Sequence, residues 1–190
     1  MDVTLQTQSV YSAAAVTVAF LLVGCSDGPR VGVHQYRVPT DHLVSKSSYP
    51  FFLPALKYDG FIFVLNPSAP RTTQRTVQVQ QRSAICARAR GADAYVNSAI
   101  CAPQTVEWKG GRWLKSGHET FWTYSPETPS GSRAPFVNCF ALQMERHPGL
   151  CHATLPYNDL AVIISLNDDE MPALEDTYNQ AVSSLRSWER

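Results

Sequence analysis

The chain has 190 residues, 44% of them hydrophobic, and its 16 Lys and Arg residues balance 16 Asp and Glu residues. This length suits a single domain with a substantial core, and the neutral charge argues against a general nucleic-acid binder. The charges are unevenly distributed, because residues 30–115 carry 12 basic and 4 acidic residues whereas residues 117–190 carry 4 basic and 10 acidic residues. This asymmetry is compatible with two faces of opposite sign.

An apolar run over residues 13–24 ends at Cys25. The run is about a dozen residues long, which suits a signal-peptide core and falls short of the roughly 20 residues of a membrane-spanning helix. Its end, Leu22-Val23-Gly24-Cys25, resembles the lipobox of bacterial lipoproteins. The preceding segment has no Lys or Arg, unlike an ordinary secretory signal, and the alternative is a buried N-terminal strand or helix with an unmodified cysteine.

The resemblance implies a signal peptide over residues 1–24, a lipidated tether over residues 25–32 and a single domain over residues 33–190. Cys25 would carry the lipid, and more than one acyl chain would give stable anchoring. The mature protein would then lie on the periplasmic face of the cell envelope. Ser26 after the cysteine favours the outer membrane.

Four further cysteines form an even set in a chain expected to reach an oxidising compartment. We expect the pairs that are local in sequence, Cys86 with Cys101 and Cys139 with Cys151. Loops of this size would contribute roughly 3 kcal/mol each in the chain-entropy model. A zinc site is the alternative, but the chain has no C-x-x-C or H-x-x-x-H spacing.

Patterns of apolar residues predict the first strands. Residues 33–39 are expected to form a strand. Residues 61–65 are a continuous apolar run before Asn66-Pro67, which predicts a strand buried on both faces and then a turn. Residues 76–80 alternate polar and apolar, so this strand should have one solvated face.

A hairpin is expected over residues 107–114, because its central Gly-Gly pair supplies the positive φ angles that a two-residue turn requires. Its register would place Trp108 opposite Trp113. Residues 121–124 predict the next strand. Residues 125–135 are rich in Pro, Ser and Thr, and they predict a long exposed loop.

Residues 136–144 and 150–155 predict two paired strands that would bring Cys139 and Cys151 together. Residues 160–166 form the most apolar strand, which we expect near the centre of the sheet.

The C-terminal segment changes to a helical period, with apolar residues at spacings of three and four. This stripe consists of Met171, Leu174, Tyr178, Ala181, Leu185 and Trp188. Acids at 168–170 would begin the helix, as its dipole prefers, and Pro172 is tolerated in the first turn. The expected fold class is α+β, a mainly antiparallel sheet or sandwich with this helix packed on it, plus a short helix near residues 42–47 or 92–99.

The sequence has no H-E-x-x-H, P-loop or G-x-G-x-x-G pattern, and its one G-x-S-x-G match, residues 24–28, overlaps the lipobox. We therefore expect no enzyme, no cofactor and no metal. Cys151-His152 cannot form a dyad on a strand, because neighbours point to opposite faces. The acids at 168–170 could hold a cation, but a helix start, which prefers acids, explains them better. His118-Glu119 could be catalytic, but a surface position explains the pair more simply.

Five basic residues could bind lipid head groups, or they could form the solvated face of polar strands. They are Arg71, Arg75, Arg82, Arg88 and Arg90.

The lipobox, the mature size, the β-rich body and the terminal helix together resemble the immunity lipoproteins that Gram-negative bacteria encode beside type VI secretion effectors, particularly phospholipase toxins. The resemblance implies a cognate toxin as protein partner, contact with the membrane through the lipid anchor, and no nucleic acid. The alternative is a structural or assembly lipoprotein of an envelope complex. The expected contact residues are Trp108, Arg112, Trp113, His118, Trp122, Glu127 and Arg133. Core positions are the alternative for Trp113 and Trp122.

Overall fold

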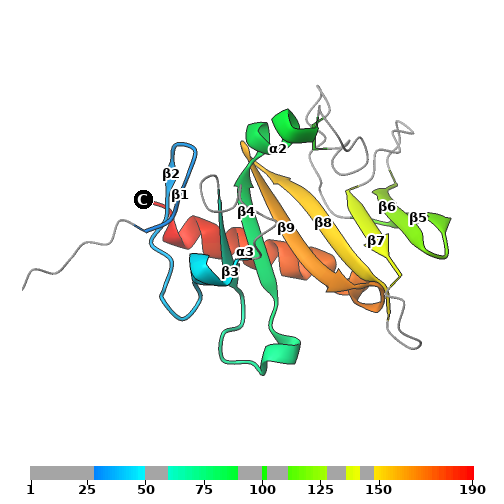
Figure 1. The fold of residues 1–190 in the computed structure, drawn as a ribbon, viewed down its shortest axis with the longest axis horizontal. Helices are drawn as coiled ribbons and strands as arrows, with labels where there is room; N and C mark the ends of the chain where they lie inside the picture. Colours follow the sequence, from blue (N-terminus) through cyan, green and yellow to red (C-terminus); the bar gives the residue numbers. More distant parts are fainter. Residues whose placement is uncertain (1–27, 50–59, 90–99, 102–110, 128–135, 142–147) are drawn as a thin grey trace, which may run out of the picture.

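The computed structural model describes residues 28–49, 60–89, 100–101, 111–127, 136–141 and 148–190. Within these ranges seven strands form one antiparallel sheet in the order β3-β4-β9-β8-β7-β6-β5, and helix α3 crosses one of its faces (Figure 1). A small antiparallel hairpin of β1 and β2 lies beside the β3 edge. The expected α+β fold class is confirmed.

The strands of the main sheet are β3 (Gly60–Val64), β4 (Thr76–Gln81), β5 (Trp113–His118), β6 (Phe121–Pro126), β7 (Val137–Phe140), β8 (Leu150–Tyr157) and β9 (Leu160–Asn167). The small hairpin pairs β1 (Arg30–Val31) with β2 (His34–Gln35). The helical elements are the 3-10 turns η1 (Lys46–Ser48), η2 (Arg71–Thr73) and η3 (Asp168–Ala173) and the α-helices α2 (Arg82–Ala89) and α3 (Leu174–Trp188).

The sheet follows the period of two that its sequence predicts. On β9 the alternate residues Leu160, Val162, Ile164 and Leu166 are buried, and they face α3. Strand β9 lies between β4 and β8, which confirms the expected interior position of the most apolar strand.

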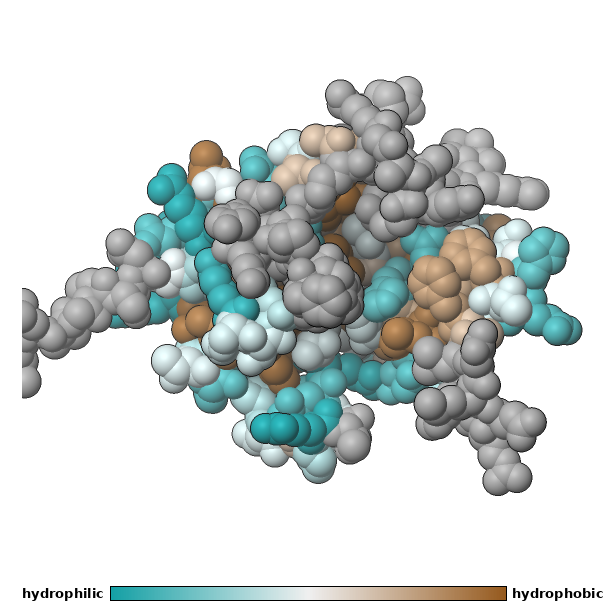
Figure 2. All heavy atoms as spheres, viewed as in Figure 1, coloured by the Kyte–Doolittle hydropathy of each residue, from teal (hydrophilic) through white to brown (hydrophobic). Residues whose placement is uncertain are grey.

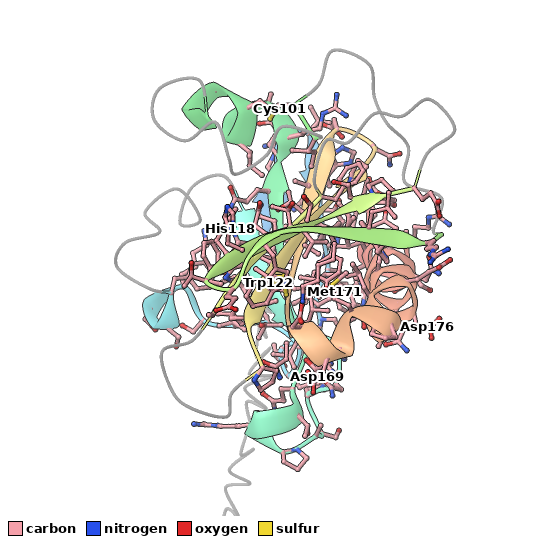
Figure 3. The ribbon with its side chains drawn as sticks, turned by 90° about the vertical axis from the view of Figure 1, so that its right-hand side faces the viewer. Cys101, His118, Trp122, Asp169, Met171 and Asp176 are labelled. Atoms are coloured by element: carbon pink, nitrogen blue, oxygen red, sulfur yellow. A yellow bond between two sulfur atoms is a disulfide. The ribbon has the colours of Figure 1, made fainter. Side chains whose placement is uncertain are left out.

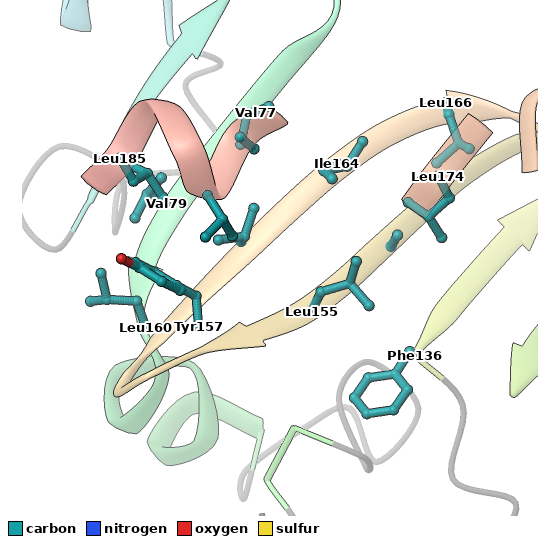
Figure 4. Packing of buried hydrophobic residues seen from close by; sticks show 14 of the residues in the cluster. Val77, Val79, Phe136, Leu155, Tyr157, Leu160, Ile164, Leu166, Leu174 and Leu185 are labelled. Atoms are coloured by element: carbon teal, nitrogen blue, oxygen red, sulfur yellow. The ribbon is translucent and has the colours of Figure 1, made fainter. Parts of the chain in front are cut away.

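Helix α3 buries the expected stripe against this face of the sheet (Figure 4). Leu174, Ala181 and Leu185 are fully buried, and Tyr178 and Trp188 pack at the margin of the core. The segment begins as predicted with its acids, which lie in η3. The remaining member of the stripe, a buried methionine, is also in η3, so the α-helix itself starts one turn later than the pattern suggests. Among the described residues no helix is long and apolar enough to cross a membrane.

The opposite face of the sheet is partly covered by α2. Ile85 of this helix packs with Ile100 and with Ala161 of β9, and Cys86 bonds to Cys101 beside them. The second disulfide joins directly paired residues of β7 and β8, Cys139 and Cys151, whose Cα atoms lie 4.0 Å apart. Both expected pairings are confirmed.

Several element predictions need correction. The strand expected over residues 33–39 is shortened to β2 and an isolated bridge at Tyr36, and β2 pairs with β1 across a turn in which Gly32 has a φ of +58°. Residues 82–89 form α2, so Arg82 and Arg88 lie on a helix and not on a polar strand. Ser125 and Pro126 are buried in β6 and do not begin an exposed loop.

The other differences concern element ends. The first of the expected short helices is a single 3-10 turn, η1, and the second, residues 92–99, lies outside the described residues. Strand β7 ends at Phe140, earlier than expected, and β8 continues to Tyr157. The hairpin expected over residues 107–114 also falls largely outside the described ranges.

Candidate functional site

The β5–β6 hairpin forms one edge of the sheet. Its turn is Glu119-Thr120, and its register runs from His118 opposite Phe121 to Trp113 opposite Pro126. Residues 114–119 are all exposed. Gly117 has a φ of +133°, and a Cβ there would lie 2.5 Å from the carbonyl oxygen of Phe121, so this position requires glycine.

Asp168 of η3 fixes the hairpin to the body of the protein. Its Oδ1 accepts hydrogen bonds from Trp122 Nε1 and from the Tyr124 hydroxyl, each 2.7 Å long. Its Oδ2 accepts one from Lys115 Nζ at 2.8 Å. One carboxylate therefore holds three side chains of two neighbouring strands, which is a rigid arrangement for a surface feature.

The electrostatics of this contact favour the ionised pair. Burial favours the neutral acid, but the hydrogen bonds from Lys115, Tyr124 and Trp122 hold the pKa of Asp168 below its usual value. The hydrogen bond between Lys115 and Asp168 also raises the pKa of Lys115. The Lys115 ammonium also lies 4.5 Å from the centre of the Trp122 ring and 5.5 Å from that of Tyr124, so both rings add cation–π attraction.

Trp122 belongs to the core, which is the alternative that the sequence left open for this residue. It is 8% exposed and packs in the main hydrophobic cluster, on the side of the hairpin that faces η3 (Figure 3). Gly149 makes room for its ring, because a Cβ there would lie 2.2 Å from the indole. A partner can reach only the small part of Trp122 that remains exposed.

A hollow of about 490 Å³ opens beside β5. It is lined by Lys115, Ser116, Gly117, His118, Glu119, Trp122 and Asp168. Four consecutive lining residues, Lys115 to His118, belong to β5, and the Trp122–Asp168 hydrogen bond links the hairpin to η3. The lining combines a cation, an imidazole and two carboxylates with one aromatic ring, which suits recognition of a polar ligand.

The structure places most of the predicted contact residues on this hairpin or beside it. Arg112, His118 and Glu127 are exposed, and the Arg112 carbonyl accepts a hydrogen bond from the Glu127 amide at 2.9 Å. Trp113 is half-buried against the core. Cys25, Trp108 and Arg133 lie outside the described residues.

An aromatic patch on the opposite side of the hairpin was not predicted. Phe121 of β6 and Phe140 of β7 are directly paired, with ring centres 5.3 Å apart, and Phe140 is 45% exposed. The ring of His152 on β8 lies 6.5 Å from that of Phe140. Figure 2 shows hydrophobic side chains gathered over this end of the sheet. Only the register of three strands brings these residues together.

A second polar cluster joins the two ends of the described chain. The His34 ring donates from Nδ1 to Glu189 Oε1 at 2.6 Å and from Nε2 to Asp159 Oδ1 at 2.7 Å. Its hydrogen bond to Glu189 raises the pKa of His34, burial opposes the rise, and the bond to Asp159 adds to it. Both ring nitrogens face carboxylates, so the doubly protonated ring fits this site best.

Metal binding is not supported at the one cluster of potential ligands among the described residues, Cys139, Cys151 and Asp168. Its two sulfurs are bonded to each other, and Asp168 is occupied by its three donors. The pairing also removes Cys151 as a nucleophile beside His152. Comparison of the chain with protein-family models, with curated proteins and with solved structures finds no match.

Proposed function

We propose that this protein is a membrane-tethered periplasmic binding protein, and that it serves as an immunity protein that neutralises a cognate secreted toxin such as a type VI lipase effector. The observation that carries the proposal is the exposed β5 rim with its adjoining hollow, held in place by Asp168. A rigid surface loses little conformational entropy when it binds a partner, which favours affinity.

The proposed lipid anchor on Cys25 adds to this arrangement. An inhibitor and a toxin that both act at one membrane surface meet at a raised effective concentration. The bound toxin would then be kept from the bilayer or have its active site covered.

The second candidate is a structural or assembly lipoprotein of an envelope complex. The pair of half-buried Phe121 and exposed Phe140 supports it, because an aromatic patch on the face opposite the hollow would let the domain contact a second protein. The two functions place the main contact on different faces of the same end of the sheet.

The test is co-expression of this protein with periplasm-directed products of its neighbouring genes. We expect one neighbour to be toxic alone, to be tolerated with this protein, and to form a stable purified complex with it. The Cys25→Ala variant should bind this toxin in solution but protect cells less well, and intact mass measurement should show the lipid on the wild type alone. If no neighbour is toxic, or if the toxic one does not bind, the assembly function takes its place.

A further inference from the structure

The sheet has two edges, and the first is closed by the protein itself. Residues 42–49 run along β3 and form hydrogen bonds with backbone groups of β3 that point away from the sheet. The Val44 amide bonds to the Ile62 carbonyl at 3.0 Å, and the Val64 amide bonds to the His42 carbonyl at 2.8 Å. The Ile62 amide donates to the Tyr49 hydroxyl at 2.9 Å. This edge offers no place for another strand.

The second edge, along β5, is open at Lys115 and Gly117 in the part of the chain that the structure describes. The hydrogen bond from the Glu127 amide to the Arg112 carbonyl shows which residues of β5 bond to β6, because hydrogen-bonded pairs alternate along an antiparallel ladder. Residues at even positions therefore bond to β6, and the amides and carbonyls of Lys115 and Gly117 point away from the sheet. Neither backbone has a partner among the described residues, and both residues are exposed.

We infer that the outer edge of β5 is a strand-addition site, which takes an extended segment of a protein partner carrying an acidic side chain opposite Lys115. Edge strands with unpaired backbone groups recruit extended segments in this way, and pockets beside the strand select their side chains. The inference rests on the proposed function, since it describes how the binding surface would hold its partner.

The hollow determines the chemistry of the incoming segment. Side chains of an added strand that lie on the Lys115 face would enter the hollow, where Gly117 contributes no side chain of its own. Lys115 already donates to Asp168 at 2.8 Å, but its ammonium has three donors and its side chain is half-exposed. A carboxylate on the added strand, on the side of Lys115 away from Asp168, would accept a second charge-assisted bond. Glu119 at the turn would repel an acid at that end, so the acidic residue belongs beside Lys115.

Charge argues against a second copy of this chain as the occupant. Residues 112–118 carry Arg112 and Lys115 and no Asp or Glu. Antiparallel pairing of two β5 strands about their centre would set the two Lys115 ammonium groups close together, and like charges in such positions destabilise a sheet. An acidic segment of another protein would pair with the same edge without the repulsion between two lysines.

The experiment selects phage-displayed random octapeptides on the full-length protein in detergent. Enriched peptides should carry Asp or Glu within alternating sequences. A synthetic copy should then bind Lys115→Ala less well than wild type by roughly tenfold, the worth of one charge-assisted hydrogen bond. Lys115→Pro, which also removes the outward N–H, should weaken binding by roughly a further fivefold. Arg71→Glu, a charge reversal at exposed Arg71 in η2, should not change the affinity, whereas Lys115→Glu should abolish binding.

Amide exchange provides a readout that needs no variant, in case Lys115→Pro fails to fold. The amides of Lys115 and Gly117 should exchange rapidly in the free protein and slowly in the peptide complex. The inference would be overturned if these two amides exchanged equally fast at saturating peptide, or if the Ala and Pro variants bound the peptide equally well. It would also be overturned if the selection enriched no peptides, or enriched basic ones. So would a wild-type dimer in sedimentation that Lys115→Pro converts to a monomer, because the edge would then belong to a second copy.

The two proposals fail separately. If a toxic neighbour binds and is neutralised equally well by wild type and by Lys115→Pro, the immunity function stands and the edge inference falls. If the peptide binds as expected and no toxic neighbour exists, the edge inference stands and the immunity function falls.

Discussion

Asp168 and Glu170 lie two residues apart at the start of η3 and bond to different parts of the sheet. Asp168 accepts its three hydrogen bonds from side chains of β5 and β6. Glu170 accepts from Nη1 of Arg75, the residue before β4, at 2.6 Å, and from the Asn167 amide at 2.8 Å. Acids at a helix start are favoured by the dipole alone. Here they also connect strands that lie on opposite sides of β8 and β9.

His34 gives the N-terminal hairpin a pH-dependent attachment. Its pKa is raised in the folded protein from an ordinary value of 6.5, so the bonded imidazolium stabilises the fold fully below that pH. This stabilisation is lost as the pH rises from 6.5 through the raised value. We expect His34→Gln to cost about 1 kcal/mol at pH 6, in the range of partly exposed ion pairs, and much less at pH 9.

Urea unfolding of wild type and His34→Gln at pH 6 and pH 9, followed by Trp fluorescence, measures this difference. His118→Gln is the matched control, because His118 is exposed at the hairpin turn. An equal loss of stability at both pH values would show that the carboxylates do not hold a protonated ring.

At the scale of elements, α3 does more than cover the sheet. Its C-terminal end and the residues after it bind β2 and the segment that follows β2. The Arg37 amide donates to the Trp188 carbonyl at 2.7 Å, and the Arg190 amide donates to the Gln35 carbonyl at 3.0 Å. The ring of Trp188 meets Phe63 of β3 edge-on, with centres 5.0 Å apart. Val31 of β1 is fully buried in the main cluster, so the folded domain already begins within the tether expected over residues 25–32. The proposed tether would therefore lead directly to a hairpin that the terminal helix fixes to the core.

The burial of α3 predicts the effect of truncating it. Leu185 is fully buried in the main cluster, so Leu185→Ala should lower the free energy of unfolding by roughly 2 to 5 kcal/mol. Ser183→Ala, on the exposed side of the same helix, should change it by less than about 0.5 kcal/mol. Urea unfolding measures both, and similar small changes would mean that the helix does not pack as described.

At the scale of the molecule, the sheet interleaves the two parts of the chain. Strands β6 to β9, from the acidic part, lie between β4, from the basic part, and β5, which begins at the end of the basic part. Basic residues of the first part therefore form ion pairs with acids of the second part. Lys115 Nζ lies 2.8 Å from Asp168 Oδ2, and Arg75 Nη1 lies 2.6 Å from Glu170 Oε2. At these contacts the opposite charges neutralise one another and do not separate into two faces.

This interleaving also explains what the sequence could predict. The strands of residues 61–65 and 160–166 and the stripe of α3 depend on local periodicity, and the disulfides depend on short separations, so all were predicted correctly. The bonds of Asp168 to Trp122 and of His34 to Glu189 span 46 and 155 residues. Such contacts follow from strand order, which periodicity does not encode. Helix α2 was missed because its sequence, RSAICARA, has little amphipathic pattern.

The disulfides should contribute unequally to the stability of the whole molecule. Each closes a short loop, with separations of 15 and 12 residues, and would contribute roughly 3 kcal/mol by chain entropy. Cys139 and Cys151 are also fully buried in the main cluster, whereas Cys86 and Cys101 are partly exposed. Replacing the buried pair by Ala should therefore cost more, because it removes buried sulfur atoms beside Asp168.

The two double variants, Cys139→Ala with Cys151→Ala and Cys86→Ala with Cys101→Ala, separate these contributions in urea unfolding. Wild type denatured without reductant should show no free thiol among these four cysteines, and each double variant should retain the other bond. Near-ultraviolet circular dichroism should change in the first variant, because Trp122 is paired with Cys139 across β6 and β7. If the Cys86 and Cys101 variant is the less stable of the two, the fold depends more on the attachment of α2 than on the joined centre of the sheet.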